Sequence, residues 1–498
     1  MSALEVRDLS VTIGGARVVD AVSFTVDPGE CVAIVGESGA GKSLTASALL
    51  GLAPSVARVT ATTLDVDGVD TRRFGEREWR RLRGRRIALV SQDALVSLDP
   101  LRTIGAEIAE PLEIHRRLTA AQRRGRVLEL LDAVAMPDAA RRVGQYSHEL
   151  SGGLRQRALI ASALACAPAV LVADEPTTAL DATVQARILD LLRGIADAGT
   201  AVVFISHDFA AVRRIADRVL VMRNGRVVEA GGVEQVLQAP QHEYTRQLIA
   251  ATTHEPRRIV DGIGEPVITG VRVSKSFGLM PAVIEASFEA GRGRTLGIVG
   301  ESGSGKTTLA RMLVGVEHPD TGELRWNGTH RVQLVHQNPL GAFDPRWTIG
   351  RSLHEALAAG KVPRPQRPTR VAELLAEVGV DAALAGRRPA ALSGGQRQRA
   401  AIARALAADP DVLVLDEPVS ALDPSVRERI LQLLRRLQRD RGLTMIFVSH
   451  DLDVVAAVAD DVLVMQDGRI VEQGHTGEVF KAPQHPFTRE LLAASVVP

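Results

Sequence analysis

Two segments of the chain carry glycines, a lysine and a hydroxyl residue at the spacing of a phosphate-binding loop. Each follows a short apolar run and precedes a helix-compatible run, so we expect a strand before it and a helix after it. The glycines let backbone N–H groups turn toward an anion, and the positive end of the helix faces the same anion. Lys42 and Lys306 would reach the β- and γ-phosphates, and the hydroxyls of Ser43 and Thr307 would ligate Mg²⁺. The two segments are Gly36-Glu37-Ser38-Gly39-Ala40-Gly41-Lys42-Ser43 and Gly300-Glu301-Ser302-Gly303-Ser304-Gly305-Lys306-Thr307.

A pair of acids ends a buried apolar run in each half of the chain. We expect Asp174 and Asp416 to hold Mg²⁺ through water. Glu175 and Glu417, which follow them, could accept a proton from a water that attacks the γ-phosphate in line. A simpler interpretation is that paired acids at a strand end are favourable charges at a helix N-terminus. The same ordered set occurs twice, which argues against that interpretation.

Histidine and glutamine end the neighbouring strands. His207 and His450 could contact the γ-phosphate or the attacking water. Gln92 and Gln337 end a third strand and could complete the shell of the Mg²⁺ or of the water. A strand-end histidine taken alone is more often a surface residue, so this prediction depends on the whole set.

The chain is long and has almost no net charge. At 498 residues it is too long for one ordinary core. Lys+Arg (60) nearly balance Asp+Glu (59), so no basic field argues for a nucleic-acid partner. Two cysteines, Cys31 and Cys166, support neither a disulfide framework nor a zinc or iron–sulfur site. We see no signal peptide and no apolar run near the roughly 20 residues that span a bilayer, so we expect a soluble chain or one docked onto membrane proteins.

The elements that position these residues indicate an α/β fold. Residues 1–30 alternate apolar and polar positions around Gly14-Gly15, which predicts antiparallel strands joined by a turn. Continuous apolar runs that alternate with helical segments predict a mainly parallel sheet covered on both faces. In the first half we expect strands at Ile87–Val90, Ala169–Glu175 and Ala201–His207, a helix at Leu44–Leu52 and a helical subdomain at Ile104–Met136.

The second half repeats this order. Ser393 follows Ser151 at an offset of 242 residues, and the strand-end aspartates recur at the same offset, whereas the loop lysines recur at 264. The extra 22 residues of the first half therefore lie after its phosphate loop, mostly around Thr60–Arg86. We predict one nucleotide-binding domain at residues 1–252, a linker at 253–266 and a second domain at 267–498.

Over both halves the chain resembles the nucleotide-binding domains of ABC ATPases. Besides the motifs above, it has the signatures Leu150-Ser151-Gly152-Gly153 and Leu392-Ser393-Gly394-Gly395 and the D-loops Ala179-Leu180-Asp181 and Ala421-Leu422-Asp423. The resemblance implies two P-loop NTPase domains of the ABC type, each with a parallel core, an antiparallel β subdomain and a helical subdomain. It implies ATP and Mg²⁺ as cofactors and an ATPase activity. It also implies that Ser151, Gly152 and Gly153, like Ser393, Gly394 and Gly395, cap the γ-phosphate held by the other half, so that the halves form one nucleotide sandwich.

One family position differs between the halves. Phe277 lies 29 residues before Lys306, where the family usually places an aromatic that stacks on adenine. The same count back from Lys42 reaches Ile13. The resemblance therefore implies adenine stacking at the second site only.

Finer features are similar to the ATPases of peptide, opine and nickel importers. These are the lead-in Tyr146–Glu149, the membrane-facing segments Gln92–Gly105 and Gln337–Gly350, and the tails Ala239–Arg246 and Ala482–Arg489. The resemblance implies a peripheral protein at the cytoplasmic face of the membrane that powers uptake of peptides, nickel or metallophore-type substrates. Its partners would be two separate permease subunits and an extracytoplasmic binding protein. Because no cysteine-rich segment follows either tail, we expect no iron–sulfur cluster and lean toward nickel or metallophore import.

Two alternatives stay open at this stage. One is the fused ATPase of a vitamin or cobalt importer, which lacks this type of tail. The other is a tandem ABC factor acting on ribosomes or DNA. The ribosomal type has a long charged arm that residues 253–266 are too few to form, and the DNA-repair type has zinc cysteines that this chain lacks.

Overall fold

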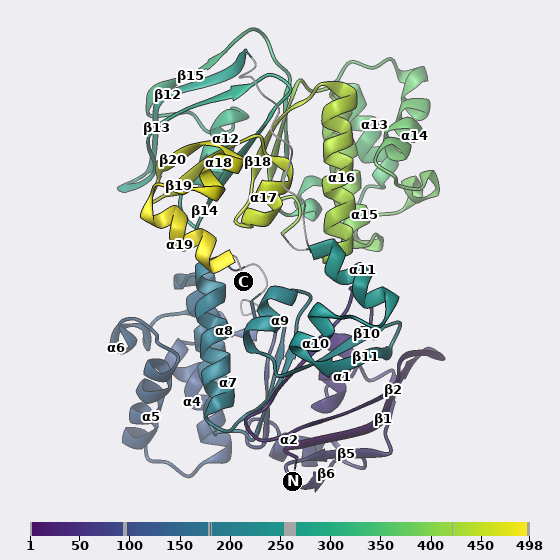
Figure 1. Cartoon of the computed structure of the whole chain (residues 1–498), viewed down its shortest axis with the longest axis vertical. Coiled ribbons are helices and arrows are strands. Elements are labelled where there is room, and N and C mark those ends of the chain that lie inside the picture. Colours follow the sequence, from purple (N-terminus) through teal and green to yellow (C-terminus); the bar gives the residue numbers. More distant parts are fainter. Residues whose placement is uncertain are drawn as a thin grey trace. The chain divides into compact units, whose positions relative to one another are not determined.

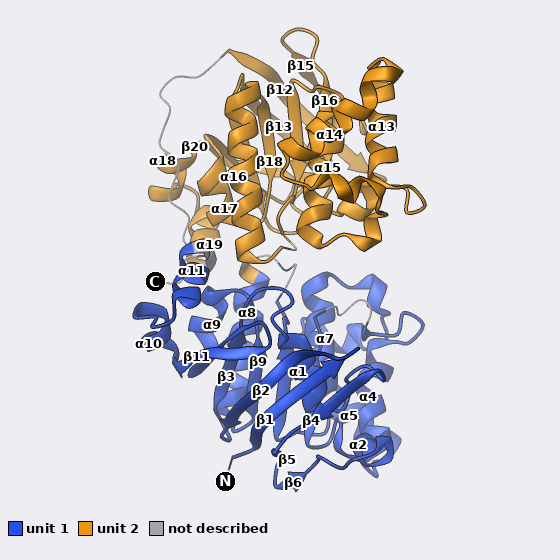
Figure 2. Cartoon of the chain, turned by 90° about the vertical axis from the view of Figure 1, so that its right-hand side faces the viewer, with its two compact units in different colours: residues 1–180, 184–252, 497 blue, residues 181–183, 253–496, 498 orange. Residues whose placement is uncertain are grey.

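The computed structural model describes residues 2–92, 97–177, 180, 182–252, 265–420 and 422–495. The chain divides into two compact units, one built from residues 1–180 and 184–252 and the other mainly from residues 253–496 (Figure 2). Residues 93–96 of the first membrane-facing segment, three D-loop residues (179, 181 and 421) and residues 253–264 of the expected linker lie outside the described residues.

The first unit is built on a six-stranded sheet in the order β11-β10-β3-β9-β8-β7. Its neighbouring strands are parallel except for β10 and β11, as the continuous apolar runs predicted. The phosphate loop follows β3 at the centre of the sheet. The strands are β3 (Cys31–Val35), β7 (Ile87–Val90), β8 (Val170–Asp174), β9 (Ala201–Ile205), β10 (Arg218–Arg223) and β11 (Arg226–Gly232).

A second, antiparallel sheet contains the first strands of the chain. Strands β1 (Leu4–Ile13) and β2 (Ala16–Val26) pair antiparallel across the Gly14-Gly15 turn, as predicted. Both glycines have positive φ, at 56° and 84°. Three shorter strands complete this sheet: β4 (Ala57–Thr60), β5 (Thr63–Val66) and β6 (Val69–Asp70).

Helices surround the core sheet of the first unit (Figure 1). The expected helical subdomain at Ile104–Met136 contains α4 and α5, and α7, which lies beyond that range, packs with them. The helix after the phosphate loop begins at Lys42 and ends at Leu49, earlier than the predicted Leu44–Leu52. The helices are α1 (Lys42–Leu49), α2 (Glu76–Leu82), α4 (Ile104–His115), α5 (Ala120–Ala133), α6 (Ala139–Arg142), α7 (Gly152–Leu164), α8 (Ala182–Asp197), α9 (Phe209–Ile215), α10 (Val233–Gln238) and α11 (Glu243–Thr252).

The second unit repeats the strand order of the first as β20-β19-β14-β18-β17-β16. Its antiparallel sheet has the order β13-β12-β15. Pro266, the last residue of the expected linker, is already the first residue of β12. The strands are β12 (Pro266–Phe277), β13 (Met280–Gly291), β14 (Thr295–Gly300), β15 (Thr321–Trp326), β16 (Val332–Val335), β17 (Val412–Asp416), β18 (Thr444–Val448), β19 (Asp461–Gln466) and β20 (Arg469–His475).

The helices of the second unit also follow the first, with α13, α14 and α15 as its helical subdomain (Figure 1). In the first unit β5, β6 and α2 lie between β4 and β7, whereas in the second β15 is followed directly by β16. Because β15 pairs with β12 where both β4 and β5 pair with β1, the elements without a counterpart in the second unit are β6 and α2, which lie within the extra residues that the sequence placed around Thr60–Arg86. The helices are α12 (Lys306–Leu313), α13 (Ile349–Ala359), α14 (Arg367–Glu377), α15 (Gly394–Leu406), α16 (Pro424–Arg441), α17 (Leu452–Val458), α18 (Thr476–Lys481) and α19 (Pro486–Ser495).

The predicted fold class is confirmed: each unit combines a mainly parallel core, an antiparallel β subdomain and a helical subdomain. Among the helices that the structure describes, none combines the length and the apolar character that crossing a membrane requires.

Candidate nucleotide sites

The phosphate loops connect β3 to α1 and β14 to α12, and glycine is required in them for steric reasons. A Cβ at Gly36 would lie 2.3 Å from the carbonyl oxygen of Met222, and one at Gly300 would lie 2.1 Å from that of Met465. Gly41, which precedes α1, has a φ of 98°, in the left-handed region that favours glycine. The loop thus packs against the end of the neighbouring strand while its helix begins at the lysine.

Each loop lysine is buried and bonded to its own loop. Lys42 Nζ donates to the carbonyl oxygens of Gly36 (2.7 Å) and Glu37 (3.1 Å). Lys306 Nζ donates to those of Gly300 (2.8 Å) and Glu301 (2.6 Å). Both lysines are only 6% exposed. The ammonium group is therefore held over the loop, where it can meet an incoming phosphate.

A hydroxyl and a carboxylate meet at the expected metal position of each unit. Ser43 Oγ donates to Asp174 Oδ1 at 3.1 Å, and Thr307 Oγ1 donates to Asp416 Oδ1 at 3.2 Å. Burial raises the pKa of both aspartates above the ordinary value, and the adjacent Glu417 raises that of Asp416 further. A cation would relieve this cost. Hard oxygen donors of this kind fit Mg²⁺, so the residues present are suited to the ion.

The strand-end acids that follow are held by glutamine and histidine in the same way in both units. Glu175 accepts from Gln92 Nε2 at 3.0 Å and lies 3.2 Å from His207 Nδ1. Glu417 accepts from Gln337 Nε2 at 2.9 Å and lies 3.2 Å from His450 Nδ1. Three residues from three strand ends therefore fix each carboxylate in one orientation. Such a carboxylate can orient a water and accept its proton.

In the second unit, Glu417 and His450 shift each other's pKa values. Burial disfavours the charge of Glu417, but the hydrogen bond and charge of His450, with the charge of Lys306, outweigh it, so the pKa of Glu417 lies below its ordinary value. Burial likewise opposes the charge of His450, but Glu417 outweighs it and raises the pKa of His450. The pair is thus stabilised in its ionised form.

The backbone of both glutamates is strained. Glu175 and Glu417 each have a φ of 47°, in the left-handed region that residues with a Cβ rarely adopt. Their N–H groups donate to the carbonyl oxygens of Ile205 and Val448, each at 2.9 Å, which holds this conformation. Strain of this kind costs about 1–3 kcal/mol and concentrates at functional sites.

The signature serines lie at the N-terminal ends of α7 and α15, and the two are held differently. Ser393 Oγ accepts from the N–H of Gln396 at 3.3 Å, while Gln396 Oε1 accepts from the N–H of Ser393 at 2.9 Å. This reciprocal pair is a capping box. In the first unit Leu154 occupies the place of Gln396, and Ser151 makes no side-chain capping bond. The sequence difference was visible, but its effect on the serine was not predicted.

The structure thus brings lysine, hydroxyl residue, aspartate, glutamate, glutamine and histidine together at the carboxyl ends of parallel strands in each unit. Phe277 stands apart at the end of β12, where it is 49% exposed, with Lys275 Nζ 5.8 Å from its ring centroid. Sequence reasoning did not assign a role to Tyr244, whose hydroxyl accepts a hydrogen bond from the N–H of Glu37 in the phosphate loop at 3.2 Å. The sequence feature that could have pointed to Tyr244 is the tail Ala239–Arg246, which contains it.

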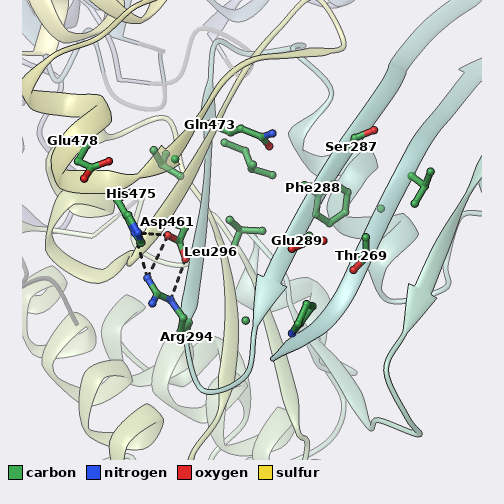
Figure 3. Close-up of a pocket in the computed structure, with 17 residues that line it drawn as sticks. Thr269, Ser287, Phe288, Glu289, Arg294, Leu296, Asp461, Gln473, His475 and Glu478 are labelled. Atoms are coloured by element: carbon green, nitrogen blue, oxygen red, sulfur yellow. Dashed lines mark hydrogen bonds and ion pairs between the residues drawn. The ribbon is translucent and has the colours of Figure 1, made fainter. Parts of the chain in front are cut away.

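A cavity of about 630 Å³ in the second unit is separate from this site (Figure 3). It lies between the antiparallel sheet and the amino ends of β14 and β19, whereas the phosphate loop follows the carboxyl end of β14. On its wall Asp461 Oδ2 lies 3.0 Å from Arg294 Nε, and Asp461 Oδ1 lies 2.8 Å from His475 Nδ1 (Figure 3). These charges already pair with one another.

Comparison with known proteins agrees with this geometry. Residues 19–178 and 283–420 match the ABC transporter family, and residues 228–264 and 471–498 match the family described as "Oligopeptide/dipeptide transporter, C-terminal region". The chain is 44% identical to the peptidoglycan transport ATP-binding protein YejF of Agrobacterium fabrum, over 99% of this chain and 96% of that protein. It is 40% identical to the glutathione import ATP-binding protein GsiA of Pectobacterium atrosepticum, over 99% of this chain and 89% of that protein.

Among solved structures, the archaeal ribosome recycling factor aABCE1, in complex with the ribosomal stalk protein aP1, is similar with a TM-score of 0.67. The match covers 96% of this chain and 90% of that chain at 23% sequence identity, which shows a shared fold and nothing more. Three observations identify the family of this chain: the motifs repeated in both halves, the two tails, and the 40–44% identity to transport ATP-binding proteins. The chain belongs to the ABC transporter family and is the ATP-hydrolysing subunit of an ABC importer, with two nucleotide-binding halves in one chain and with ATP and Mg²⁺ as cofactors.

Proposed function

We propose that this subunit powers the uptake of peptides or peptide-derived compounds. Importer ATPases are membrane-associated and work with permeases and substrate-binding proteins. The observation that carries the finer assignment is the pair of tails, because both halves end in the oligopeptide/dipeptide type of C-terminal region. The relatives named for peptidoglycan and glutathione import, both compounds that contain peptide bonds, support the same class of cargo. Nickel is named by neither relative nor family description, so the lean toward nickel or metallophore import stays an untested prediction.

The specific partners in this proposal are two separate permease subunits and an extracytoplasmic binding protein. The chain would bind the permeases from the cytoplasmic face, and the binding protein would deliver cargo on the other side. Selectivity for the cargo then resides in those other chains, because function depends on sites rather than on the fold.

Within each half we assign roles from the contacts described above. Loop backbone and lysine bind the phosphates, Ser43 with Asp174 and Thr307 with Asp416 hold Mg²⁺, and Gln92 and Gln337 complete its shell or that of the water. Bound Mg²⁺ would neutralise developing charge on the phosphates. Glu175 and Glu417 serve as bases, and His207 and His450 orient them and meet the γ-phosphate. The signature serines cap the γ-phosphate held by the other half, as the family resemblance implies.

The competing function is that of a tandem ABC factor acting on ribosomes. Its support is the fold similarity to aABCE1, but 23% identity supports the fold alone. The importer relatives match nearly the whole chain at 40–44% identity. The importer is therefore the better-supported function.

Affinity purification of the tagged chain from detergent-solubilised membranes tests the proposal. We expect two permease subunits to co-purify, and we expect the ATPase activity of the complex to rise when a peptide-loaded binding protein is added. A cargo panel of di- and tripeptides, glutathione and nickel complexes then identifies the substrate class. Co-purification of ribosomal proteins in place of permeases would contradict the proposal.

A further inference from the structure

Each unit ends in a tail that is fastened to the edge strand by the same contacts. Glu229 of β11 accepts from the N–H groups of Gln241 (2.7 Å) and His242 (3.0 Å), and the N–H of Tyr244 donates to His242 Nδ1 at 3.1 Å. In the second unit Glu472, Gln484, His485 and Phe487 make the same set at 2.7, 3.0 and 3.2 Å. Tyr244 and Phe487 therefore occupy matching places, at the start of α11 and α19.

The two aromatic residues differ in what they can reach. Tyr244 is 4% exposed, its hydroxyl accepts the N–H of Glu37 at 3.2 Å, and the guanidinium of Arg223 lies 4.7 Å from its ring centroid. Phe487 is equally buried, at 5% exposure, but has no hydroxyl. The tail of the first unit can therefore hold its phosphate loop through this bond, and the tail of the second cannot.

Glu37 is held from both sides. Its N–H donates to Tyr244, and its carbonyl oxygen accepts from Lys42 Nζ at 3.1 Å. A phosphate that binds in the loop competes with this carbonyl for the lysine ammonium. When the lysine turns toward the phosphate, the Glu37 carbonyl oxygen keeps the bond from the N–H of Ala40 at 3.1 Å, within the loop, and the bond to Tyr244 holds the N–H of Glu37 from outside the loop.

We propose that Tyr244 is a positioning residue for ATP at the first site, through which the tail pre-organises the phosphate loop. This inference rests on the proposed nucleotide site at Lys42. Removing the hydroxyl leaves the ring packing intact, as Phe487 shows, and loses one buried hydrogen bond. On the scale of such a bond, affinity for ATP at the first site should fall about fivefold, because the loop must then be ordered by the ligand itself.

The test uses the full-length chain with one phosphate loop disabled. Lys306→Ala leaves the first site, and a fluorescent ATP analogue is titrated into this variant with and without Tyr244→Phe. We expect about fivefold weaker binding with Tyr244→Phe. We also expect faster hydrogen exchange in the peptide that contains Glu37, and a fall in melting temperature no larger than the about 2–4 °C that one hydrogen bond is worth in a domain of this size. In the Lys42→Ala background, which leaves the second site, Tyr244→Phe should change neither affinity nor exchange around Glu301.

Unchanged affinity at the first site, or an equal loss at both sites, would overturn the proposed role of Tyr244. A loss of affinity that accompanies a larger fall in melting temperature and no local change in exchange would also overturn it, because that pattern indicates general destabilisation. If the Lys306→Ala variant bound no nucleotide at all, the assignment of the first site would fail instead, so the two failures are distinguishable.

Discussion

Replacing Glu175 or Glu417 should slow ATP hydrolysis without preventing ATP binding. Glutamine keeps their size and most of their hydrogen bonds but cannot accept a proton. In Glu175→Gln and Glu417→Gln we expect ATP binding to persist while turnover falls by about 10²–10⁴-fold, as for a lost general base. Phosphate release and nucleotide retention measure the two quantities on the same sample. Near-normal turnover in the double variant would place the base elsewhere, and Glu478→Gln, at the cavity on the opposite edge of the sheet, serves as a control.

The pair Glu417 and His450 predicts how the stability of the nucleotide-free protein depends on pH. The contribution of His450, whose pKa is raised from 6.5, is full below that pH and is lost as the pH rises through the higher folded value. The contribution of Glu417, whose pKa is lowered from 4.5, is full above that pH and is lost as the pH falls through the lower folded value. Both contributions are therefore present between about pH 4.5 and 6.5.

The measurement is the melting temperature of the wild type and of His450→Gln from below pH 4.5 to well above pH 6.5, so that it also covers the raised folded pKa of His450. We expect the difference between them to be largest near pH 5–6 and to shrink as the pH rises through the folded pKa of His450. A difference that grows with rising pH would contradict the ionised pair. His148, which is exposed, provides a control histidine in His148→Gln.

At this scale the sequence predicted the residues that share a strand end, because the carboxyl ends of parallel strands meet at one edge of a sheet. It did not predict the bond between Tyr244 and Glu37, which are 207 residues apart. Whether a tail hydroxyl reaches the loop depends on how α11 packs, and no local pattern encodes that. The left-handed backbone of the two glutamates was equally invisible, because it depends on the strands on both sides.

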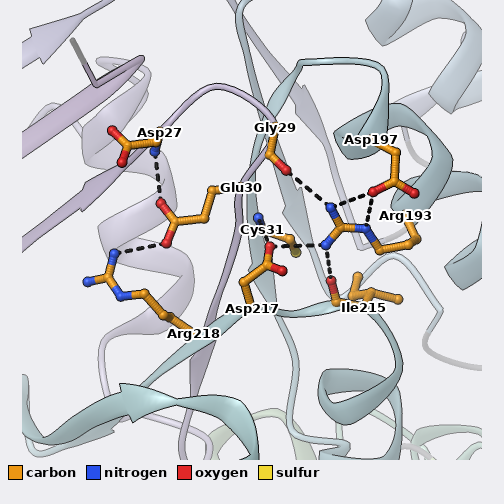
Figure 4. Close-up of polar contacts among 9 residues, drawn as sticks. All are labelled: Asp27, Gly29, Glu30, Cys31, Arg193, Asp197, Ile215, Asp217 and Arg218. Carbon is orange, nitrogen blue, oxygen red and sulfur yellow. Dashed lines mark hydrogen bonds and ion pairs between the residues drawn. The ribbon is translucent and has the colours of Figure 1, made fainter.

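At the scale of elements, an ion pair ties the start of each core sheet together with opposite polarity in the two units. In the first, Glu30 Oε1 accepts from Arg218 Nη1 at 2.9 Å (Figure 4). In the second, Arg294 Nε lies 3.0 Å from Asp461 Oδ2 (Figure 3). Glu30 precedes β3 and Arg218 begins the neighbouring strand β10. In the second unit Arg294 precedes β14 and Asp461 begins the neighbouring strand β19. The acidic and basic residues have therefore exchanged places between the units, and both units keep an ion pair between the same two strands.

Charge reversal of the more buried pair tests this interpretation. Arg294→Glu puts two acids together and should cost about 1.5–3 kcal/mol, the range for hydrogen bonds to charged groups. For a domain of this size that lowers the melting temperature of the second unit by about 3–12 °C. Arg294→Glu with Asp461→Arg recreates the polarity of the first unit and should recover most of the loss. A double variant no more stable than Arg294→Glu alone would show that the residues act separately.

The order of elements was predictable from apolar runs and from the repeat, including the position of the extra residues that contain β6 and α2. The residues at which each helix and strand begins and ends were less predictable. The first phosphate-loop helix begins at Lys42 rather than Leu44, because Gly41 in the left-handed region caps it. A propensity pattern favours neither choice, since the start depends on backbone geometry in the loop.

At the scale of the whole molecule, the two sites share a catalytic set but differ around it. Phe277 is half-exposed at the end of β12, whereas Ile13 stands at the matching end of β1. Losing a base–aromatic stack costs about 1–3 kcal/mol, so at the low end adenine should contribute about tenfold less affinity at the first site. Ile13→Tyr should therefore tighten ATP binding in the Lys306→Ala background. Phe277→Ile should weaken it in the Lys42→Ala background, and the absence of both changes would contradict a stacking role.

The central claim is that each half of this importer ATPase binds one ATP through its own phosphate loop. The most direct test counts ATP bound per chain at saturation in the Glu175→Gln, Glu417→Gln double variant with Mg²⁺, by equilibrium dialysis. We predict two ATP molecules, one after adding Lys42→Ala, one after adding Lys306→Ala, and none with both. One ATP per chain when both lysines are present, or binding that survives the loss of both, would contradict it.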